Sequence, residues 1–137
     1  MCIYSKRLFE EWCKYEKIVL AVDYDDTLFP WDTFKNSRDR ERTIRLVLKA
    51  QKLGAYIVIF TASDKERYDE IIKYCKNLGI VVDAINQNPI DLPYGNSGKI
   101  FYNHNLCDKS GLRGAIKILK KASTKYKFYK NRRILTN

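Results

Sequence analysis

One stretch, residues 17–30 (KIVLAVDYDDTLFP), constrains the fold more than any other part of the chain. It contains the apolar, β-branched-rich run 18–22, which is typical of a strand buried in a parallel sheet. Three carboxylates follow at once, those of Asp23, Asp25 and Asp26. Open α/β sheets bind ligands at the carboxyl ends of their strands, so these acids are candidates for chemistry. A strand that ends in a solvated turn also favours Asp, and that interpretation stays open.

Downstream, the order helix, Leu-Gly, strand occurs twice. Apolar residues recur at helical spacing through residues 39–53, and a continuous apolar strand follows at residues 55–60 (AYIVIF). Residues 63–66 (SDKE) have the S-x-x-E form of a capping box and predict a second helix, which leads to a strand candidate at residues 80–85. This rhythm is typical of right-handed βαβ crossovers. We therefore predict an α/β fold, a Rossmann-like three-layer sandwich with a mainly parallel central sheet.

The remaining segments complete a single predicted domain over residues 1–122. Residues 5–16 have apolar and aromatic side chains near helical spacing, which predicts an amphipathic helix that packs on the sheet. Residues 100–107 resemble a further strand, interrupted by polar residues, and residues 111–122 predict a basic amphipathic helix. Residues 123–137 interleave aromatic and basic side chains and are predicted to form a C-terminal tail.

The formal net charge of +10 is concentrated late in the sequence. No acidic residue follows Asp108, whereas ten Lys and Arg residues do. A basic tail of this kind suggests a polyanionic partner, either nucleic acid or an acidic protein surface. A solvated helix face with a loose end is the alternative interpretation.

Composition argues against a membrane-spanning protein. The chain of 137 residues is 45% hydrophobic, and no apolar run approaches the roughly 20 residues that a membrane span requires. The first residues lack the long apolar segment of a signal peptide, so we expect a cytoplasmic location. The four cysteines form no metal-type CxxC pair, which predicts free thiols at Cys2, Cys13, Cys75 and Cys107.

Polar residues at the ends of the predicted strands form a candidate site. Asp23, Asp25, Thr61 and Asp108 each follow an apolar run, and parallel strands end at the same edge of a sheet. Gathered carboxylates repel one another unless a cation lies among them, and an all-oxygen set suits Mg²⁺. A phosphate would complete the charge balance, bound by Thr61 and by Lys99 from a nearby loop. One carboxylate can then attack phosphorus while another protonates the leaving oxygen.

Two further residues are candidates for substrate binding. Ser63 stands at a predicted helix start, where an anion is favoured. Trp31 belongs to an aromatic-rich loop whose rings suit contact with a base or another flat substrate. Packing of these rings within the loop itself is the alternative interpretation.

At this point the sequence resembles a known family. Residues 23–28 (DYDDTL) after an apolar strand look like the D-x-D-x-T-L signature of the haloacid dehalogenase-like (HAD) phosphatases. Thr61 at a strand end, Lys99, and Asp108 after a further strand resemble the second, third and fourth motifs in order. The resemblance covers residues 17–122. Within it, the DAINQNP segment and the KIFYN to DKSGL stretch look like a small subgroup of compact hydrolases.

This resemblance implies a Mg²⁺-dependent phosphomonoester hydrolase. Asp23 would be the nucleophile that forms an aspartyl-phosphate, and Asp25 would be the general acid and then the general base. Thr61 and Lys99 would bind the transferring phosphoryl group, and Asp23, the backbone carbonyl of Asp25, and Asp108 would hold Mg²⁺. Fold-level analogy suggests a nucleotide or a nucleic-acid phosphate as the substrate.

The fourth motif departs from the family pattern. The subgroup has two adjacent acids there, and Cys107 occupies the position of the first. A thiol is a poor Mg²⁺ ligand, because hard cations prefer oxygen. We therefore keep two hypotheses: an active hydrolase in which Asp108 completes the metal site, and a catalytically weakened binding module whose basic tail binds nucleic acid or an acidic partner.

Spacing within the resemblance also predicts how open the site is. The segments between Leu28 and Thr61, and between Thr61 and Lys99, are short and are filled by predicted helices, strands and loops. They leave no room for a substantial cap domain, so an open site that admits a large substrate is expected. Thr27 would shape the loop after the first strand, and Asp26 is assigned no catalytic role.

Overall fold

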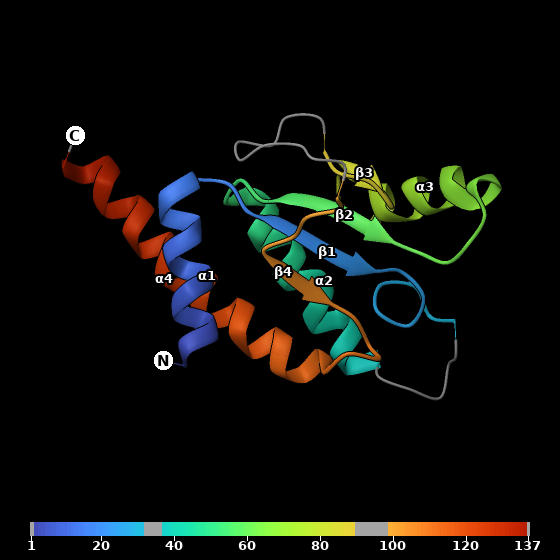
Figure 1. Ribbon diagram of the computed structural model, residues 1–137, viewed down its shortest axis with the longest axis horizontal. Coiled ribbons are helices and arrows are strands. Elements are labelled where there is room, and N and C mark those ends of the chain that lie inside the picture. Colours follow the sequence, from blue (N-terminus) through green and yellow to red (C-terminus); the bar gives the residue numbers. More distant parts are fainter. Residues whose placement is uncertain (1, 32–36, 90–98, 137) are drawn as a thin grey trace.

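The structure is a computed structural model that describes residues 2–31, 37–89 and 99–136. Figure 1 labels its helices and strands. In chain order they are α1 (Ile3–Tyr15), β1 (Val19–Asp23), α2 (Ser37–Lys52), β2 (Tyr56–Phe60), the 3-10 turn η1 (Lys65–Arg67), α3 (Tyr68–Leu78), β3 (Ala84–Ile85), β4 (His104–Leu106) and α4 (Leu112–Thr136).

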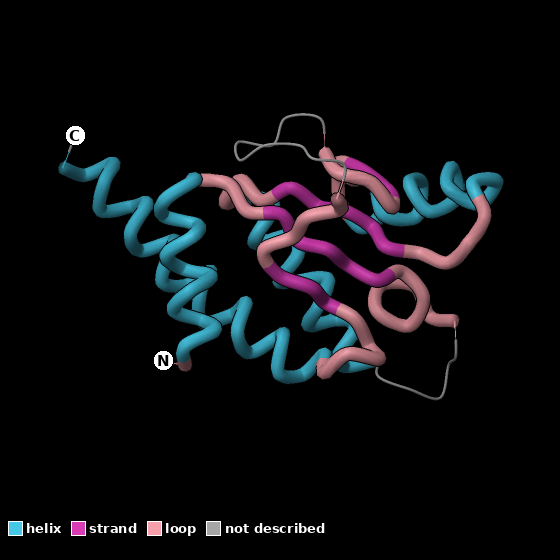
Figure 2. Tube along the Cα trace, in the orientation of Figure 1, coloured by secondary structure: helices cyan, strands magenta, loops and turns pink. Residues whose placement is uncertain are grey.

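The strands form one sheet in the order β3-β2-β1-β4, and every neighbouring pair is parallel. Val22 in β1 lies opposite Ile59 in β2 and opposite Leu106 in β4. Helices flank the sheet, as Figures 1 and 2 show. The predicted α/β class with a Rossmann-like arrangement is therefore confirmed, and within the described residues the sheet is wholly parallel.

The core explains why the first strand is so apolar. Leu20 and Val22 of β1 are fully buried in a large cluster with side chains from all four long helices. Val19, which points to the opposite face, is equally buried in a smaller cluster with Val58 and Ala84. Each such side chain removed from water contributes about 1.5–3 kcal/mol to folding. Side chains on both faces of β1 therefore stabilise the fold. Their burial fixes the position of the strand and, with it, the position of Asp23 at its end.

The third and fourth strands are shorter than their apolar patterns predicted. Strand β3 is reduced to Ala84–Ile85 and β4 to His104–Leu106. Before each of these strands, a polar side chain takes the place of a backbone hydrogen bond between strands. The backbone N–H of Ile57 donates to a carboxylate oxygen of Asp83 at 2.7 Å. The backbone N–H of Val19 donates to the side-chain amide oxygen of Asn103 at 2.7 Å. These side chains satisfy the amides that a longer strand would have paired.

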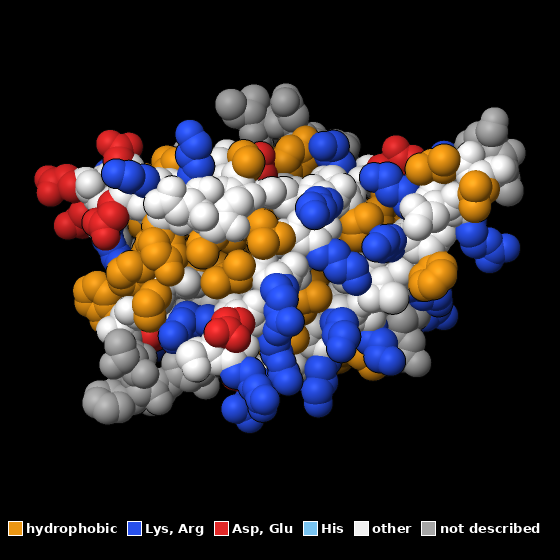
Figure 3. All heavy atoms as spheres, turned by 180° about the vertical axis from the view of Figure 1, so that it is seen from behind, with side chains coloured by type: hydrophobic (Ala, Val, Ile, Leu, Met, Phe, Trp, Pro, Cys, Tyr) orange, Lys and Arg blue, Asp and Glu red, His pale blue; other side chains and the backbone are white. Residues whose placement is uncertain are grey.

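Helix α4 corrects the prediction of a separate tail after Ala122. The helix runs without a break to Thr136, and Ala122, Ser123 and Tyr126 are buried. The Tyr126 ring stacks on the buried ring of Trp12 in α1 at a centroid distance of 4.8 Å. Tyr126 and, in part, Tyr129 therefore pack on the core, whereas Phe128 and most bases of this segment are exposed. Figure 3 shows Lys and Arg side chains gathered over the lower part of the rear face.

Two other expectations concern the chain as a whole. Between β1 and β2, and between β2 and β4, the described residues contain only α2, η1, α3, β3 and their connections, which leaves no cap domain in those parts. All four cysteines are free, as predicted. None of the helices in the described ranges is both long enough and apolar enough to cross a membrane.

Candidate active site at the carboxyl edge of the sheet

A carboxylate cluster lies where two neighbouring strands end. Asp23 is the last residue of β1, and Asp108 comes two residues after β4. The side-chain oxygens of these two residues and the Cys107 sulfur all lie within 4.8 Å of one another, and all three side chains are half-buried. Because β1 and β4 are paired, the fold itself brings together residues that are 85 positions apart. We call these three residues the carboxylate cluster.

Thr27 ties the two halves of this cluster together. Its buried hydroxyl accepts a hydrogen bond from the Asp108 backbone N–H at 3.0 Å and lies 3.5 Å from a carboxylate oxygen of Asp23. The turn that carries it is closed by Asp26, which has the left-handed φ of 61° and donates its N–H to the Phe29 carbonyl at 2.7 Å. Asp26 thus has a local structural contact, while Thr27 orients the cluster.

The cluster strongly perturbs the ionisation of Asp23. Burial, followed by the neighbouring carboxyl group of Asp108, raises the pKa of Asp23 from its ordinary 3.8 to about 7. Two carboxyl groups at this separation cannot both ionise without repulsion. A bound cation would relieve that repulsion, so the pKa shift agrees with the chemistry of a cation site.

In the metal-free protein, we expect the free energy of unfolding to fall as the pH rises from about 4 to about 7. Over this window the folded protein holds a proton on Asp23 that the unfolded chain has already released. Unfolding therefore releases a proton, and it becomes more favourable as the pH rises. Asp23→Asn removes the titrating group, so its Tm should match the wild type near pH 4 and exceed it by about 2–8 °C near pH 7.5. Thermal denaturation in the presence of a chelator measures this difference, and parallel profiles would contradict the raised pKa.

The donor set fits Mg²⁺ only in part. Asp23 and Asp108 offer hard carboxylate oxygens, which Mg²⁺ prefers, whereas the Cys107 sulfur is a soft ligand. The two carboxylates would hold the ion together with water, and Cys107 would stand beside it rather than bind it. The predicted metal residues Asp23 and Asp108 are thus adjacent, and the backbone carbonyl of Asp25 as a third ligand stays a prediction.

Cys107→Asp is therefore expected to tighten Mg²⁺ binding by about tenfold, because a third carboxylate adds a hard, charged ligand. The Mg²⁺ concentration that gives half of the rise in Tm should shift down by this factor. Cys107→Ser is the matched control, since it changes the sulfur to a small oxygen without adding charge. If the Asp and Ser variants bind Mg²⁺ equally, the added carboxylate is not near the ion.

A second group of side chains surrounds Asp25. Both carboxylate oxygens of Asp25 accept hydrogen bonds from the two terminal nitrogens of Arg67, at 2.9 and 3.0 Å. Arg67 also donates to the Ser63 hydroxyl at 2.7 Å. Its guanidinium carbon lies 5.0–5.5 Å from three ring centroids, those of Tyr24, Phe29 and Trp31. The residues predicted to bind substrate, Ser63 and Trp31, therefore meet at an arginine.

Sequence reasoning missed Arg67. It follows Ser63 by four residues, one helical turn, and no known motif marks it. Its position depends on where η1 begins, and the predicted capping box at residues 63–66 does not form: Asp64 caps the turn without a side-chain hydrogen bond. The hydroxyl of Ser63 accepts from Arg67 instead, which holds the guanidinium over the loop after β1.

Thr61 lies at the end of β2 with part of its hydrogen-bonding capacity already used. Its backbone N–H donates to the Asn86 side-chain oxygen at 2.9 Å, so this amide is already engaged within the protein. Its hydroxyl accepts from the Ser63 N–H at 3.0 Å and keeps its own proton to donate. The hydroxyl of Thr61 therefore stays a candidate for phosphate binding, and its amide does not.

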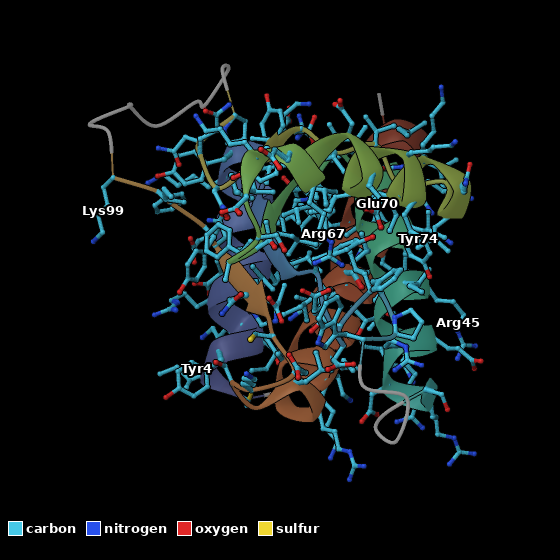
Figure 4. All side chains as sticks on the ribbon, turned by 90° about the vertical axis from the view of Figure 1, so that its right-hand side faces the viewer. Tyr4, Arg45, Arg67, Glu70, Tyr74 and Lys99 are labelled. Atoms are coloured by element: carbon cyan, nitrogen blue, oxygen red, sulfur yellow. The ribbon has the colours of Figure 1, made fainter. Side chains whose placement is uncertain are left out.

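Lys99 is the predicted site residue that the structure does not bring to the others. Its side chain is exposed, and its carbonyl accepts a hydrogen bond from the Asn88 side chain at 2.6 Å. Figure 4 views the carboxyl ends of the strands: Lys99 points outward at the periphery, whereas Arg67 lies near the centre. Arg67, rather than Lys99, is the cation that contacts the loop bearing the acids.

Comparison of the chain with family models, with curated proteins and with solved structures found no match. The site consists of two adjoining parts. One is the carboxylate cluster, formed where β1 and β4 end, and the other is the pair between Asp25, in the loop after β1, and Arg67 of η1.

Proposed function

We propose that the chain is a Mg²⁺-dependent phosphomonoester hydrolase that acts through an aspartyl-phosphate on Asp23. One observation carries this proposal: the oxygens of Asp23 and Asp108 lie within 4.8 Å of each other at the carboxyl edge of a parallel sheet. Ligands of such sheets bind at this edge. Mg²⁺, when bound by these two carboxylates, would neutralise negative charge on the site and on the phosphoryl group.

The residues divide the reaction into two displacements. In the first, a carboxylate oxygen of Asp23 bonds to phosphorus as the bond to the ester oxygen breaks, and Asp25 gives its proton to that leaving oxygen. In the second, Asp25 takes a proton from water, whose oxygen bonds to phosphorus as the acyl-phosphate bond breaks. Inorganic phosphate leaves, Asp25 releases its proton to water as it pairs with Arg67 again, and both acids return to their starting states.

Arg67 gives this proposal a feature that the motifs did not include. A guanidinium fork binds carboxylate and phosphate in the same bidentate way, so an arriving phosphoryl group competes with Asp25 for Arg67. Once the fork has moved to the substrate, the Asp25 carboxylate would be free to take up a proton from water and then give it to the leaving oxygen. Substrate binding and the freeing of the general acid would then be a single exchange.

Trp31 suits a substrate with a flat or apolar group. Its side chain is 66% exposed although its ring contacts Arg67, so it offers a free face beside the site. Large rings left in water next to a cation are common contact points for bases and aryl groups. This placement agrees with substrates larger than inorganic phosphate.

Release of inorganic phosphate from an aryl phosphate tests the proposal. We expect the wild type to release phosphate with Mg²⁺ present and to stop when a chelator removes the metal. A correctly folded wild type that releases none from aryl phosphates, nucleotides or phosphorylated oligonucleotides would contradict the proposal and favour the binding-module hypothesis.

A further inference from the structure

The seam between α2 and α4 forms a groove that starts next to the carboxylate cluster. Three hollows follow one another along it: the one beside Asp108 shares Asp39 and Arg113 with the second, and the second shares Arg42 and Lys117 with the third. Both helices begin at the carboxyl edge of the sheet and run side by side away from it (Figure 1). We call this feature the α2–α4 groove.

Basic side chains line both walls of the groove. They are Arg38, Arg42, Arg45 and Lys49 of α2 and Lys117 and Lys120 of α4. Helix α2 lies behind the sheet in Figure 1, and the rear view in Figure 3 shows Lys and Arg gathered on this side with few acids among them. The two helices thus present facing rows of cations.

The cations in these rows lack acidic partners among the residues that the structure describes. Arg113 at the mouth of the groove is paired with the buried Asp39 at 3.1 Å. Within the described ranges, none of the six lining cations forms an ion pair with an acid. Lys49 donates only to the Thr124 hydroxyl, at 2.9 Å, and burial together with Lys127 and Lys120 lowers its pKa. This crowding of positive charge would be relieved by an anion.

The spacing of the cations indicates what kind of anion fits. Arg38, Arg42, Arg45 and Lys49 recur every three or four residues, so they form one row about 16 Å long on the helix. A strand with stacked bases carries one negative charge per about 3.4 Å of helix axis, so a row of this length faces up to about five phosphates. A regular linear polyanion matches two facing rows better than a single compact anion does.

Two other polyanionic partners fit the groove less well. A lipid surface is held by apolar side chains that insert beside the charges, yet none of the exposed large apolar side chains in the described part of the chain lines the groove. A protein partner needs apolar anchor pockets, and the large apolar side chains that line the groove, Leu46, Leu112 and Ile116, are themselves largely buried.

We propose that the α2–α4 groove binds a single nucleic-acid strand through its phosphates, with one end of the strand next to Asp108. Binding by the groove does not depend on catalysis. A second step rests on the proposed function: the strand end at Asp108 would carry the phosphate that is hydrolysed, which makes a phosphorylated nucleic-acid end the substrate.

Fluorescence anisotropy with a labelled single strand of about 12 nucleotides tests the binding. For about five phosphate contacts, the logarithm of the affinity should fall with the logarithm of the salt concentration at a slope of about −3.5. The double variant Arg42→Glu/Lys117→Glu should weaken binding by about 30-fold or more at low salt and should reduce the slope. Circular dichroism confirms that the variant is folded.

The matched control is Lys73→Glu/Lys76→Glu, which makes the same change in net charge on exposed positions of α3. Measured at about 0.1 M salt, where the Debye length is about 10 Å, it should weaken binding by less than about threefold, because charges farther than this from the strand are screened. If the two double variants lost affinity for the oligonucleotide equally, the proposal that the groove binds it would be overturned. General attraction by net charge would then explain the binding. Tighter binding of polyglutamate, or of phosphatidylserine vesicles, than of the oligonucleotide would also overturn the proposal.

Measuring the binding in the Asp23→Asn background separates this inference from the proposed function. Salt-sensitive binding that the groove variant loses supports the groove even if no phosphate is ever released. For the second step, the ratio of kcat/KM on a phosphorylated oligonucleotide to that on an aryl phosphate should fall about 30-fold in Arg42→Glu/Lys117→Glu. An unchanged ratio in an active enzyme would overturn the substrate assignment alone.

Discussion

Asp23→Asn should lower phosphate release by a factor on the order of 10³ or more, because the amide cannot form the acyl-phosphate bond. The change is nearly isosteric, so the side chain still fits beside Thr27 and Asp108. The loss should appear in kcat and persist at saturating substrate, since the missing group acts in the chemical step. Initial rates of phosphate release at saturating Mg²⁺ measure this effect.

Asp26→Asn is the matched control for this experiment. It makes the same chemical change three residues away, and it keeps the side-chain oxygen that accepts from the Trp31 backbone N–H at 3.1 Å. Its rate should stay within about threefold of the wild type, as for surface changes outside the machinery. If Asp26→Asn is as inactive as Asp23→Asn, the loss comes from the loop rather than from the nucleophile.

Arg67→Ala should lower kcat/KM by about 10²–10³-fold, the effect of removing a donor that stabilises charge in a transition state. Arg67 contacts Asp25, Ser63 and Trp31, so its loss removes the fork and the support of the aromatic loop together. Arg67→Lys keeps the charge but lacks the fork, and it should recover only part of the activity. Steady-state kinetics for the three proteins measure this series.

The exchange of Arg67 between Asp25 and substrate has a second readout. Inorganic phosphate, the product, should inhibit the wild type and should inhibit Arg67→Ala much more weakly. Lys65→Ala, in the same turn and exposed, is the control and should leave inhibition unchanged. Equal inhibition of wild type and Arg67→Ala by phosphate would limit Arg67 to supporting the loop.

Local sequence patterns predicted the parts of the fold that local forces determine. The apolar run of β1 is buried on both faces. A continuous apolar run of this length is typical of a strand in a parallel sheet, so the sheet and the position of Asp23 could be predicted from it. The proximity of Asp108 followed from the rule that parallel strands end together. Both residues were therefore found without knowledge of the strand order.

The rest depended on choices that local patterns do not encode. Arg67 contacts Asp25, which lies 42 positions earlier in the sequence. This contact depends on where η1 begins, because that residue determines the position of Arg67. Ser63 had the pattern of a helix cap, but a charge-assisted bond to Arg67 took its hydroxyl instead. Lys99 was predicted from the order of motifs along the chain, and that order does not determine where its side chain points.

The stacking of Trp12 on Tyr126 has a consequence for how the chain folds. The contact joins residues 114 positions apart, and Phe9 and Tyr129 add an edge-on ring contact beside it. Closing so long a loop is slow, so we expect α1 to dock late, after the sheet has formed. Removing the segment beyond Ala122 would strip this docking surface and leave an indole in water. A weaker affinity of such a shortened chain for nucleic acid could then come from misfolding as well as from the lost positive charges. Point substitutions of the basic residues avoid this ambiguity.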